Sequence, residues 1–338
     1  MDLGLAVAGL FIGAVVGLTG MGGGALMTPV LVLFFGVPPL AAVSSDLVVS
    51  AVMKPVGGLV HLRNGTVNLG LVKLLMLGSV PSAFAGVLVI KALGDDETVQ
   101  EVVKVALGVA LLIATASLVG KAWLGMRDRA RRHREGLPPE GSATGRPDVV
   151  LRPVPTVLVG VLGGLIVGMT SVGSGSLIII ALLALYPALH ASQLVGTDLV
   201  QAVPLVASAA VGHMLFGDFQ LDVTTSLLVG ALPGVYVGAR FSSRANGGLV
   251  RRALTLVLLA SGLKLVGVPN VALGWCLLAV CVAGPLAWAW ARRRAGLPAT
   301  GRRERAARAG RDGRDGGDGA GGPRAAGDAA DRSGSTAR

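Results

Sequence analysis

Two short glycine-rich segments hold the residues of this chain whose types and spacing point most clearly to chemistry. Segment 17–24 reads Gly-Leu-Thr-Gly-Met-Gly-Gly-Gly, and segment 168–175 reads Gly-Met-Thr-Ser-Val-Gly-Ser-Gly. Both lie within long apolar stretches, where irregular backbone is tolerated only if it lines a cavity or is buried in protein. We therefore expect each segment to break a membrane helix. The free N–H groups and positive dipole end of the helix that follows would favour an anion.

If the two breaks face each other, their backbone N–H groups and hydroxyls converge on one anion. The residues expected to bind this substrate are Gly22, Gly23, Gly24, Ser171, Gly173, Ser174 and Gly175. The alternative is that the small residues only allow close helix packing. A nucleotide-binding loop does not fit, because neither segment ends in Gly-Lys-Ser/Thr and the flanks are predicted membrane helices rather than strands.

Lys54 is a basic residue within an otherwise uncharged stretch, residues 47–60. A charged side chain inside a membrane is costly and is therefore a functional hypothesis by default. Its expected role is to bind the substrate as the counter-charge of an anion. The alternative is that its ammonium group snorkels to the membrane interface near His61. The second half of the chain has Val206 at the equivalent place, so a lysine site would be one-sided.

Asp46 and Asp198 occupy equivalent positions in the two halves, each after a hydroxyl residue, Ser45 or Thr197. One interpretation is that these hydroxyl residues cap helices, with the acid in the first helical turn. The other is that the two carboxylates couple transport to protons or pair with Lys54. The sequence leaves both interpretations open, and Asp46 and Asp198 are the candidate coupling residues.

The similarity between the two halves extends well beyond the glycine segments. Residues 45–48 (Ser-Asp-Leu-Val) recur as residues 197–200 (Thr-Asp-Leu-Val). Further equivalent pairs are His61 and His213, Gly65 and Gly217, Gly78 and Gly230, Pro81 and Pro233, and Gly86 and Gly238. Self-similarity of this length predicts two copies of one structural unit. Glycine-interrupted apolar segments at matching places in two halves point to the binding site of a transporter.

The composition predicts a helical membrane protein, since 52% of residues are hydrophobic, 14% are charged and the mean hydropathy is +0.70. Runs of about 18 or more apolar residues are typical of spanning helices. Stretches that are apolar on every side lack the strict alternation of β-barrel strands. Candidate helices lie near 3–19, 25–36, 40–61, 67–91, 99–121, 154–171, 176–189, 193–214, 223–240, 249–267 and 271–291. The short segments 25–36 and 176–189 follow the glycine segments, which leaves open full spans or re-entrant hairpins.

Charged loops predict the orientation of these helices, because cytoplasmic loops collect Lys and Arg. The loops expected inside are 61–66, 122–153, 240–252 and the tail from 292. The loops expected outside are 91–98, 214–222 and 267–270. Equivalent loops of the two halves thus fall on opposite sides of the membrane. This pattern predicts inverted-topology repeats, a recurring architecture of secondary transporters.

The expected fold is therefore all-α and polytopic, with two inverted-topology repeats that contain glycine-broken helices. Its parts are repeat 1 at 1–121, a basic cytoplasmic linker at 122–153, repeat 2 at 154–268, an additional helix at 269–291 and a disordered cytoplasmic tail at 292–338. The tail has almost no apolar bulk. The net charge of +11 arises from residues between helices and in the tail, so we do not expect a nucleic-acid partner.

The sequence contains no constellation typical of an enzyme or a metal site. Its two cysteines, Cys276 and Cys281, fall in the last predicted helix, and its four histidines form no nucleophile–base or metal-ligand pattern. No ATP-binding motif is present. We expect no enzymatic activity, no catalytic residues, no cofactor and no metal. The expected partners are a small anionic substrate, the lipid bilayer and a coupling proton, whereas the oligomeric state does not follow from the sequence.

The order and duplication of these motifs resemble the sulfite exporter TauE/SafE family of membrane transporters. The segments that carry the resemblance are 17–24, 44–46, 61–65 and 78–86, and their counterparts 168–175, 196–198 and 232–234. The resemblance implies a multi-pass permease of the inner cell membrane. It also implies transport, by export, of small sulfur-containing or organic anions such as sulfite or sulfonates. A channel-like anion uniporter without ion coupling is the alternative.

Overall fold

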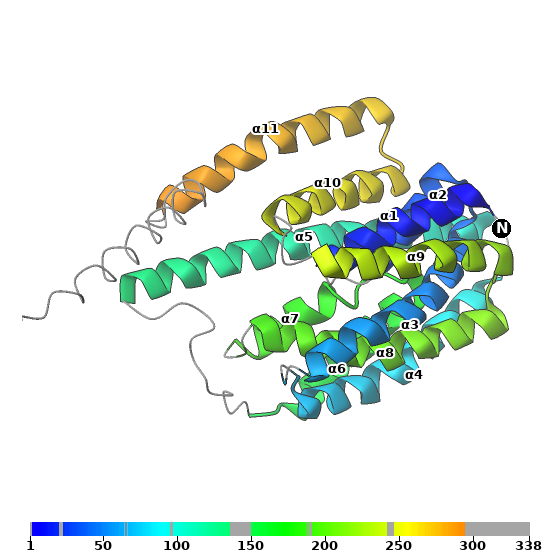
Figure 1. Cartoon of the computed structure of the whole chain (residues 1–338), viewed down its shortest axis with the longest axis horizontal. Helices are drawn as coiled ribbons and strands as arrows, with labels where there is room; N and C mark the ends of the chain where they lie inside the picture. The colour runs from blue at the N-terminus through cyan, green and yellow to red at the C-terminus, as the bar shows by residue number, and fades with distance from the viewer. Residues whose placement is uncertain are drawn as a thin grey trace, which may run out of the picture. The chain divides into compact units, whose positions relative to one another are not determined.

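The computed structural model describes residues 2–19, 23–63, 65, 67–94, 97–135, 150–187, 189, 191–241 and 247–294. All regular structure in this part of the chain is α-helical (Figure 1). The helices are α1 (Leu3–Thr19), α2 (Gly24–Phe34), α3 (Pro39–Arg63), α4 (Leu69–Leu93), α5 (Glu97–Glu135), α6 (Pro153–Thr170), α7 (Leu177–Leu185), α8 (Ala191–Phe216), α9 (Leu221–Phe241), α10 (Gly247–Leu265) and α11 (Asn270–Arg294).

Seven of the described helices are long and apolar enough to cross a membrane, namely α3, α4, α5, α6, α8, α9 and α11. By contrast, α2 has 11 residues and α7 has 9. At the rise of an α-helix these two reach only about 15 Å, roughly half the thickness of the hydrocarbon layer. The chain is thus an all-α polytopic membrane protein, which confirms this part of the fold class predicted from the sequence.

Helices α1 and α9 pack side by side and run in the same direction (Figure 1). Gly9 lies against Leu227 and Gly17 lies against Val235, so the contact advances equally along both helices. A Cβ atom added at Gly9 would lie 2.6 Å from the carbonyl oxygen of Leu227. Small residues at every fourth position therefore let the two backbones approach closely, as is common between membrane helices.

Helices α4 and α6 pack in the same way. In this pair α4 comes from the first half of the chain in the place of α9, and α6 comes from the second half in the place of α1. Gly78 lies against Val157 and Gly86 against Leu165, again in parallel. A Cβ atom at Gly86 would lie 2.8 Å from the carbonyl oxygen of Leu165. The repeated glycines of α4 and α9 are thus packing residues.

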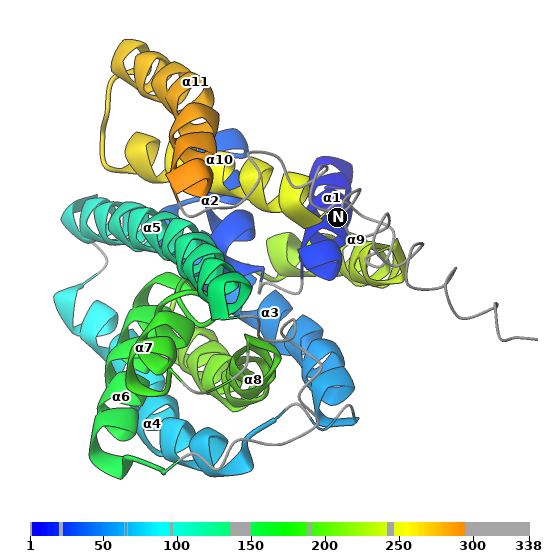
Figure 2. The same ribbon diagram turned by 90° about the vertical axis from the view of Figure 1, so that its left-hand side faces the viewer.

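Equivalent helices of the two halves meet in opposite directions. Near the start of α3, Ser44 contacts His213 near the end of α8, whereas Gly58 near the end of α3 lies against Leu199 near the start of α8. Helices α5 and α10 also pack together and are antiparallel, because Gly108 faces 262–266 and Leu112 faces Gly262. Figure 2 shows α3 beside α8, with α4 and α6 next to α8.

Helix α3 lies at the centre of the described helices. Its residues Val43 and Leu47 belong to an apolar cluster with α4, α6, α7 and α8. Its residues Ala42, Val49 and Met53 belong to a second cluster with α1, α2 and α9. Because α3 is covered on more than one side, its polar residues between positions 44 and 54 are buried within protein rather than exposed to lipid.

Helix α5 is longer than the sequence predicts. It continues to Glu135, past the expected end at residue 121, so the first part of the predicted linker 122–153 is helical. Residues 136–149 and the tail from residue 295 lie outside the described residues, as do Asp95 and Asp96 of a predicted outer loop. The chain divides into two compact units, Met1–Cys281 and Val282–Arg338. The described part of the second unit is the last portion of α11.

Candidate functional site

Both glycine segments interrupt helices at the predicted places. Helix α1 ends at Thr19 and α2 begins at Gly24, and α6 ends at Thr170 and α7 begins at Leu177. Gly22 is one of the expected site residues and lies outside the described residues, together with residues 20 and 21. The N-cap residues Gly23 and Ser176 make no side-chain capping hydrogen bond. First-turn N–H groups at both breaks are therefore not satisfied by a capping side chain.

The two breaks touch each other. Gly24 lies against Ser171, and a Cβ atom at Gly24 would collide with the Ser171 carbonyl oxygen and lie 2.9 Å from its Oγ. Ser171 has a φ of 58°, a left-handed conformation that is uncommon for a residue with a side chain, and Gly173 has a φ of 128°. Sequence positions 147 residues apart thus form one irregular region, as the convergence of two breaks requires.

The hydroxyl of Ser171 is buried in this region. It lies close enough to Asp46 to interact electrostatically, but it makes no hydrogen bond of normal geometry within the described part of the chain. Only 3% of Ser171 is exposed. A buried polar group without a partner is costly, so such a group in a native structure calls for an explanation. A ligand at the break would supply one.

Lys54 reaches the second break from the centre of α3. Its Nζ donates a hydrogen bond of 2.8 Å to Ser174 Oγ, and only 6% of the residue is exposed. The snorkelling alternative is therefore wrong, because the ammonium group turns toward the protein interior. The structure brings together Lys54 and Ser174, which lie 120 positions apart in the chain and were both expected at the site.

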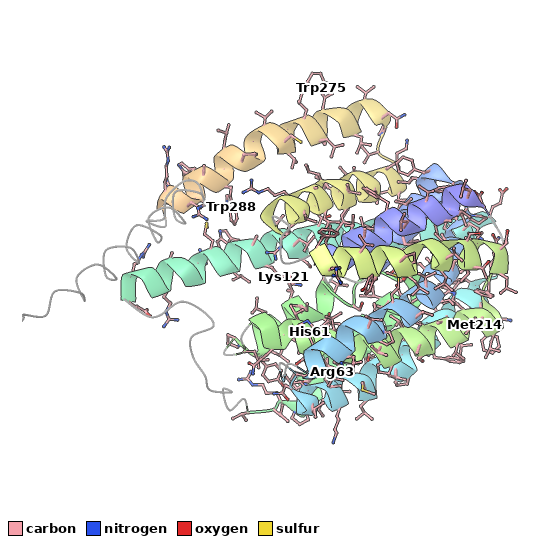
Figure 3. All side chains as sticks on the ribbon, viewed as in Figure 1. His61, Arg63, Lys121, Met214, Trp275 and Trp288 are labelled. Atoms are coloured by element: carbon pink, nitrogen blue, oxygen red, sulfur yellow. The ribbon has the colours of Figure 1, made fainter. Side chains whose placement is uncertain are left out.

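Lys121 is a second lysine at the same break, and the sequence analysis assigned it to no site. It projects from α5 in the region where α5 passes α7 (Figure 3). Its Nζ donates a hydrogen bond of 2.8 Å to the carbonyl oxygen of Gly175. In the sequence Lys121 closes an apolar stretch and precedes a basic segment, so it resembles an interfacial flank. Because α5 continues to Glu135, Lys121 lies within the helix rather than at its end, and the sequence did not reveal this.

Asp46 joins α3 to the first break. Its Oδ2 accepts a hydrogen bond of 2.6 Å from Thr28 Oγ1 on α2, and its Oδ1 accepts one of 3.3 Å from Ser50 Oγ. A Cβ atom at Gly23 would lie 3.7 Å from Asp46 Oδ1, so the break runs past this carboxylate. Asp46 is fully buried.

Asp198 lies within α8 and faces the lysines. Its Oδ1 accepts a hydrogen bond of 3.2 Å from Gln201 Nε2, and Gln201 Oε1 accepts one of 3.2 Å from Ser79 Oγ on α4. Asp198 interacts electrostatically with both Lys121 and Lys54. No ion pair within 4.0 Å joins these charges in the described residues, where the ion pairs found are Lys104–Glu101 and Arg131–Glu135.

The interpretation of Asp46 and Asp198 as first-turn acids is wrong. Helices α3 and α8 have no acidic residue in the first turn, and both carboxylates lie about two turns further in. Each helix starts earlier than the Ser45 or Thr197 hydroxyl that was considered as its cap. Thr197 Oγ1 instead accepts a hydrogen bond of 3.1 Å from the backbone N–H of Asn68.

His213 contacts the end of α6, just before the second break. Its Nε2 donates a hydrogen bond of 2.8 Å to the carbonyl oxygen of Gly168, and its Nδ1 lies 2.8 Å from Ser44 Oγ. The ring is completely buried and ties α8 to the end of α6 and the start of α3. Among the described residues, no group of three or more His, Cys, Asp or Glu side chains could hold a metal ion.

The region around the two breaks thus combines two buried or half-buried lysines with two buried carboxylates. Ionisable residues inside membrane proteins are costly and pair with one another or mark substrate and ion pathways. Here the ammonium groups bind loop atoms at the adjacent positions Ser174 and Gly175, rather than the carboxylates. The arrangement can offer N–H and O–H donors and positive charge to a small anion.

Comparison with known proteins assigns the chain to a family. The family described as sulfite exporter TauE/SafE matches residues 5–265. The probable membrane transporter protein YjnA of Bacillus subtilis (strain 168) is 37% identical over 267 residues, which are 79% of this chain and 100% of that protein. The probable membrane transporter protein YdhB of the same organism is 23% identical over 254 residues, which are 75% of this chain and 96% of that protein.

No solved structure shows a significant match to the chain. The family match covers most of the described helices, from α1 to the end of α10. Together with the seven helices long enough to span a membrane, it makes the protein a multi-pass membrane transporter. The chain belongs to the sulfite exporter TauE/SafE family.

Proposed function

We propose that this protein is a secondary transporter of the inner cell membrane that exports small sulfur-containing or organic anions such as sulfite or sulfonates. The observation that carries this proposal is the position of Lys54 and Lys121. Both ammonium groups lie at one helix break inside the membrane protein, on Ser174 and Gly175. Two positive charges close together inside a membrane protein are stabilised best when an anion binds beside them.

The remaining groups at the breaks fit an oxyanion. The starts of α2 and α7 have no capping side chain, so each presents the positive end of its helix dipole to the break. The Ser171 hydroxyl is buried without a protein partner of normal geometry in the described residues. Sulfite and sulfonates present several oxygen acceptors on one compact head group, so they can accept hydrogen bonds from several of these donors together. We propose Gly22, Gly23, Gly24, Ser171, Gly173, Ser174 and Gly175 as the substrate-binding segment residues, with Lys54 as counter-charge.

We also propose that residues 1–121 and 154–268 are inverted-topology repeats. Three observations support this architecture. Helix α3 contacts α8 in an antiparallel way, and α5 contacts α10 in the same way. The third is that α1 packs on α9 as its counterpart α6 packs on α4. In such transporters the site lies at the repeat interface, and one repeat moves against the other to open it to alternate sides. The contact between Gly24 and Ser171 lies at this interface.

A transport assay tests the function directly. Purified protein in liposomes is offered sulfite, ethanesulfonate, acetate and chloride, and accumulation is followed with and without an imposed proton gradient. We expect accumulation of sulfite or the sulfonate, and loss of it in the double variant Lys54→Met/Lys121→Met. The double variant Lys73→Met/Lys91→Met, at two exposed lysines of α4, is the matched control. A folded wild-type protein that moves none of the four anions would contradict the proposal.

Coupling separates the transporter from a channel-like uniporter. The buried carboxylates Asp46 and Asp198 favour coupling to protons, because a uniporter does not need titratable groups beside its substrate. Accumulation of the anion above its external concentration, driven by a proton gradient, would exclude the uniporter. Accumulation in inside-out membrane vesicles would correspond to export. We propose no catalytic role, no cofactor and no nucleic-acid partner for the chain.

A further inference from the structure

The two carboxylates that the repeat makes equivalent have different surroundings. We propose that Asp198 takes up the proton that accompanies the anion, whereas Asp46 is a positioning residue that holds the break before α2. The proposal rests on the anion transport proposed above. It assigns different roles to two residues that the sequence motif presents as copies of each other.

Asp46 is occupied by its neighbours. Thr28 Oγ1 donates to one carboxylate oxygen and Ser50 Oγ donates to the other, at 2.6 and 3.3 Å. Thr28 belongs to α2, so the carboxylate fixes the helix that starts at the first break. The second half has no such arrangement at Asp198, because Ile179 stands in the place of Thr28 and Ala202 in the place of Ser50. Asp46 therefore acts on the break itself.

Asp198 instead faces the two positive charges of the site. Lys121 of α5 and Lys54 of α3 both interact with it electrostatically, and Gln201 of its own helix donates to its Oδ1. The second half has no equivalent of Lys54, since Val206 occupies its place. The hydrogen bonds of the two lysines go to Ser174 and Gly175, so the lysines are shared between the break and Asp198.

The other elements packed on α8 bring few competing charges. Helix α3 also carries Asp46, and His61 and Arg63 in its last turn, whereas α6 and α7 contain no charged residue. The lysines of α4, Lys73 and Lys91, are exposed. Beyond Lys121, Arg251 of α10 adds a further positive charge that acts on that lysine. Lys54 acts on both Asp46 and Asp198, whereas Lys121 acts on Asp198 and not on Asp46, so Asp198 is the carboxylate on which both lysines act.

Charge balance then couples the anion to a proton. Arg251 is exposed to solvent, so the balance concerns the inner groups, and without substrate the charges of two lysines and two carboxylates cancel. An anion that carries one charge, such as hydrogensulfite or a sulfonate, adds one negative charge beside Asp198 when it binds Lys54 and Lys121. One proton from the same aqueous side, bound to a carboxylate oxygen of Asp198, restores the balance and leaves with the anion. Anion and proton therefore cross together, with one proton for each singly charged anion. Because the pair is electrically neutral, the outward concentration gradient of the anion can drive its export.

Two measurements on the same proteoliposomes test the assignment. The first is the proton flux that a hydrogensulfite gradient drives, followed with a pH-sensitive dye inside the vesicles. The second is the exchange of labelled sulfite at equal concentrations on both sides, which requires no net proton movement. The variants are Asp198→Asn and Asp46→Asn, with Asp222→Asn at an exposed position of α9 as control.

We expect Asp198→Asn to lower the proton flux by about tenfold or more while exchange changes much less, because coupling between two ligands is typically worth that factor. Asp46→Asn should reduce flux and exchange in the same proportion and lower the temperature of thermal unfolding. The assignment is overturned if Asp198→Asn keeps proton flux, or if Asp46→Asn loses proton flux and keeps exchange. Should Asp198→Asn not fold, Gln201→Leu takes its place. It should shift the pH midpoint of net transport, and an unmoved midpoint contradicts the assignment.

The wild-type protein separates the failure of this inference from the failure of the proposed function. If wild-type protein moves no sulfite or sulfonate, the proposed function is wrong and the inference falls with it. If it moves the anion without protons, the uniporter is correct and only the coupling is wrong. If it moves both and the variants respond alike, anion transport with protons stands and only the assignment to Asp198 is wrong.

Discussion

The two helix breaks differ in what holds them, although their sequences are copies. The first break runs past Asp46, whose oxygens are bonded to Thr28 and Ser50. The second break is held by Lys54 and Lys121, which come from the other half of the chain. A duplicated backbone motif therefore carries two chemistries. The backbone geometry belongs to the repeat, whereas the charge at each break belongs to side chains that are not repeated.

The contact between the breaks gives the largest expected effect. Gly24→Ala places a Cβ atom against the Ser171 backbone, which cannot move aside as a side chain can. We expect transport to be abolished in protein that still inserts. Gly57→Ala on α3 is the matched control, because its Cβ atom would meet only Leu199 Cδ2, at an ordinary distance of 4.0 Å. Equal activity of the two variants would show that the breaks need not touch for function.

Removal of a positive charge at the second break should have the next largest effect on transport. Lys54→Met should weaken anion binding by about tenfold or more, because a charge inside a membrane protein is worth a few kcal/mol. Lys121→Met should weaken it less, by about three- to tenfold, since this lysine is only half-buried and solvent screens its charge. Lys54→Arg should keep part of the affinity. Binding can be measured by substrate protection against thermal unfolding.

A result in which Lys54→Met binds and transports as well as wild type, at equal expression, would remove the difference between the breaks. The anion site would then consist of backbone groups alone. A larger effect of Lys121→Met than of Lys54→Met would place the anion nearer to α5 than the proposal does.

The hydroxyl that Lys54 contacts should matter less than the lysine itself. Ser174→Ala removes one hydrogen bond, typically worth about 1 kcal/mol, so we expect anion affinity to fall about fivefold. Lys54 keeps its charge in this variant and remains able to bind the anion. Ser176→Ala, at the uncapped start of α7, serves as the comparison. An effect of Ser174→Ala as large as that of Lys54→Met would mean that the serine, not the charge, dominates binding.

A change at the first break should lower the stability of the protein more than its affinity for the anion. Thr28→Val removes the donor to Asp46 and leaves a buried carboxylate short of a partner, which typically costs about 1–3 kcal/mol or more. We expect a lower temperature of thermal unfolding and little change in anion affinity per folded molecule. Retained stability together with a large loss of affinity would contradict the separation of roles between the two breaks.

The helices and their interruptions followed from the sequence because they depend on local composition. Apolar runs of helical length and the glycines inside them are visible in the sequence itself. The end of α1, the start of α2, the end of α6 and the start of α7 fall where the glycine motifs are. Lys54 and Asp46 were also recognisable, because a charge in an apolar stretch is conspicuous. Close packing through small residues was the alternative interpretation of the glycine segments, and Gly17 of α1 and Gly168 of α6 do pack closely against α9 and α4.

Tertiary structure decided which of these residues meet. Ser174 lies 120 positions after Lys54, and no local pattern says that they form a hydrogen bond. Lys121 appeared to be a helix flank, because its neighbours on the C-terminal side are basic and the extension of α5 was not apparent. Asp46 and Asp198 looked equivalent, because a sequence motif identifies the residues but not the side chains that form hydrogen bonds with them. A side chain's role depends on groups brought to it from distant helices, and sequence spacing alone does not encode that packing.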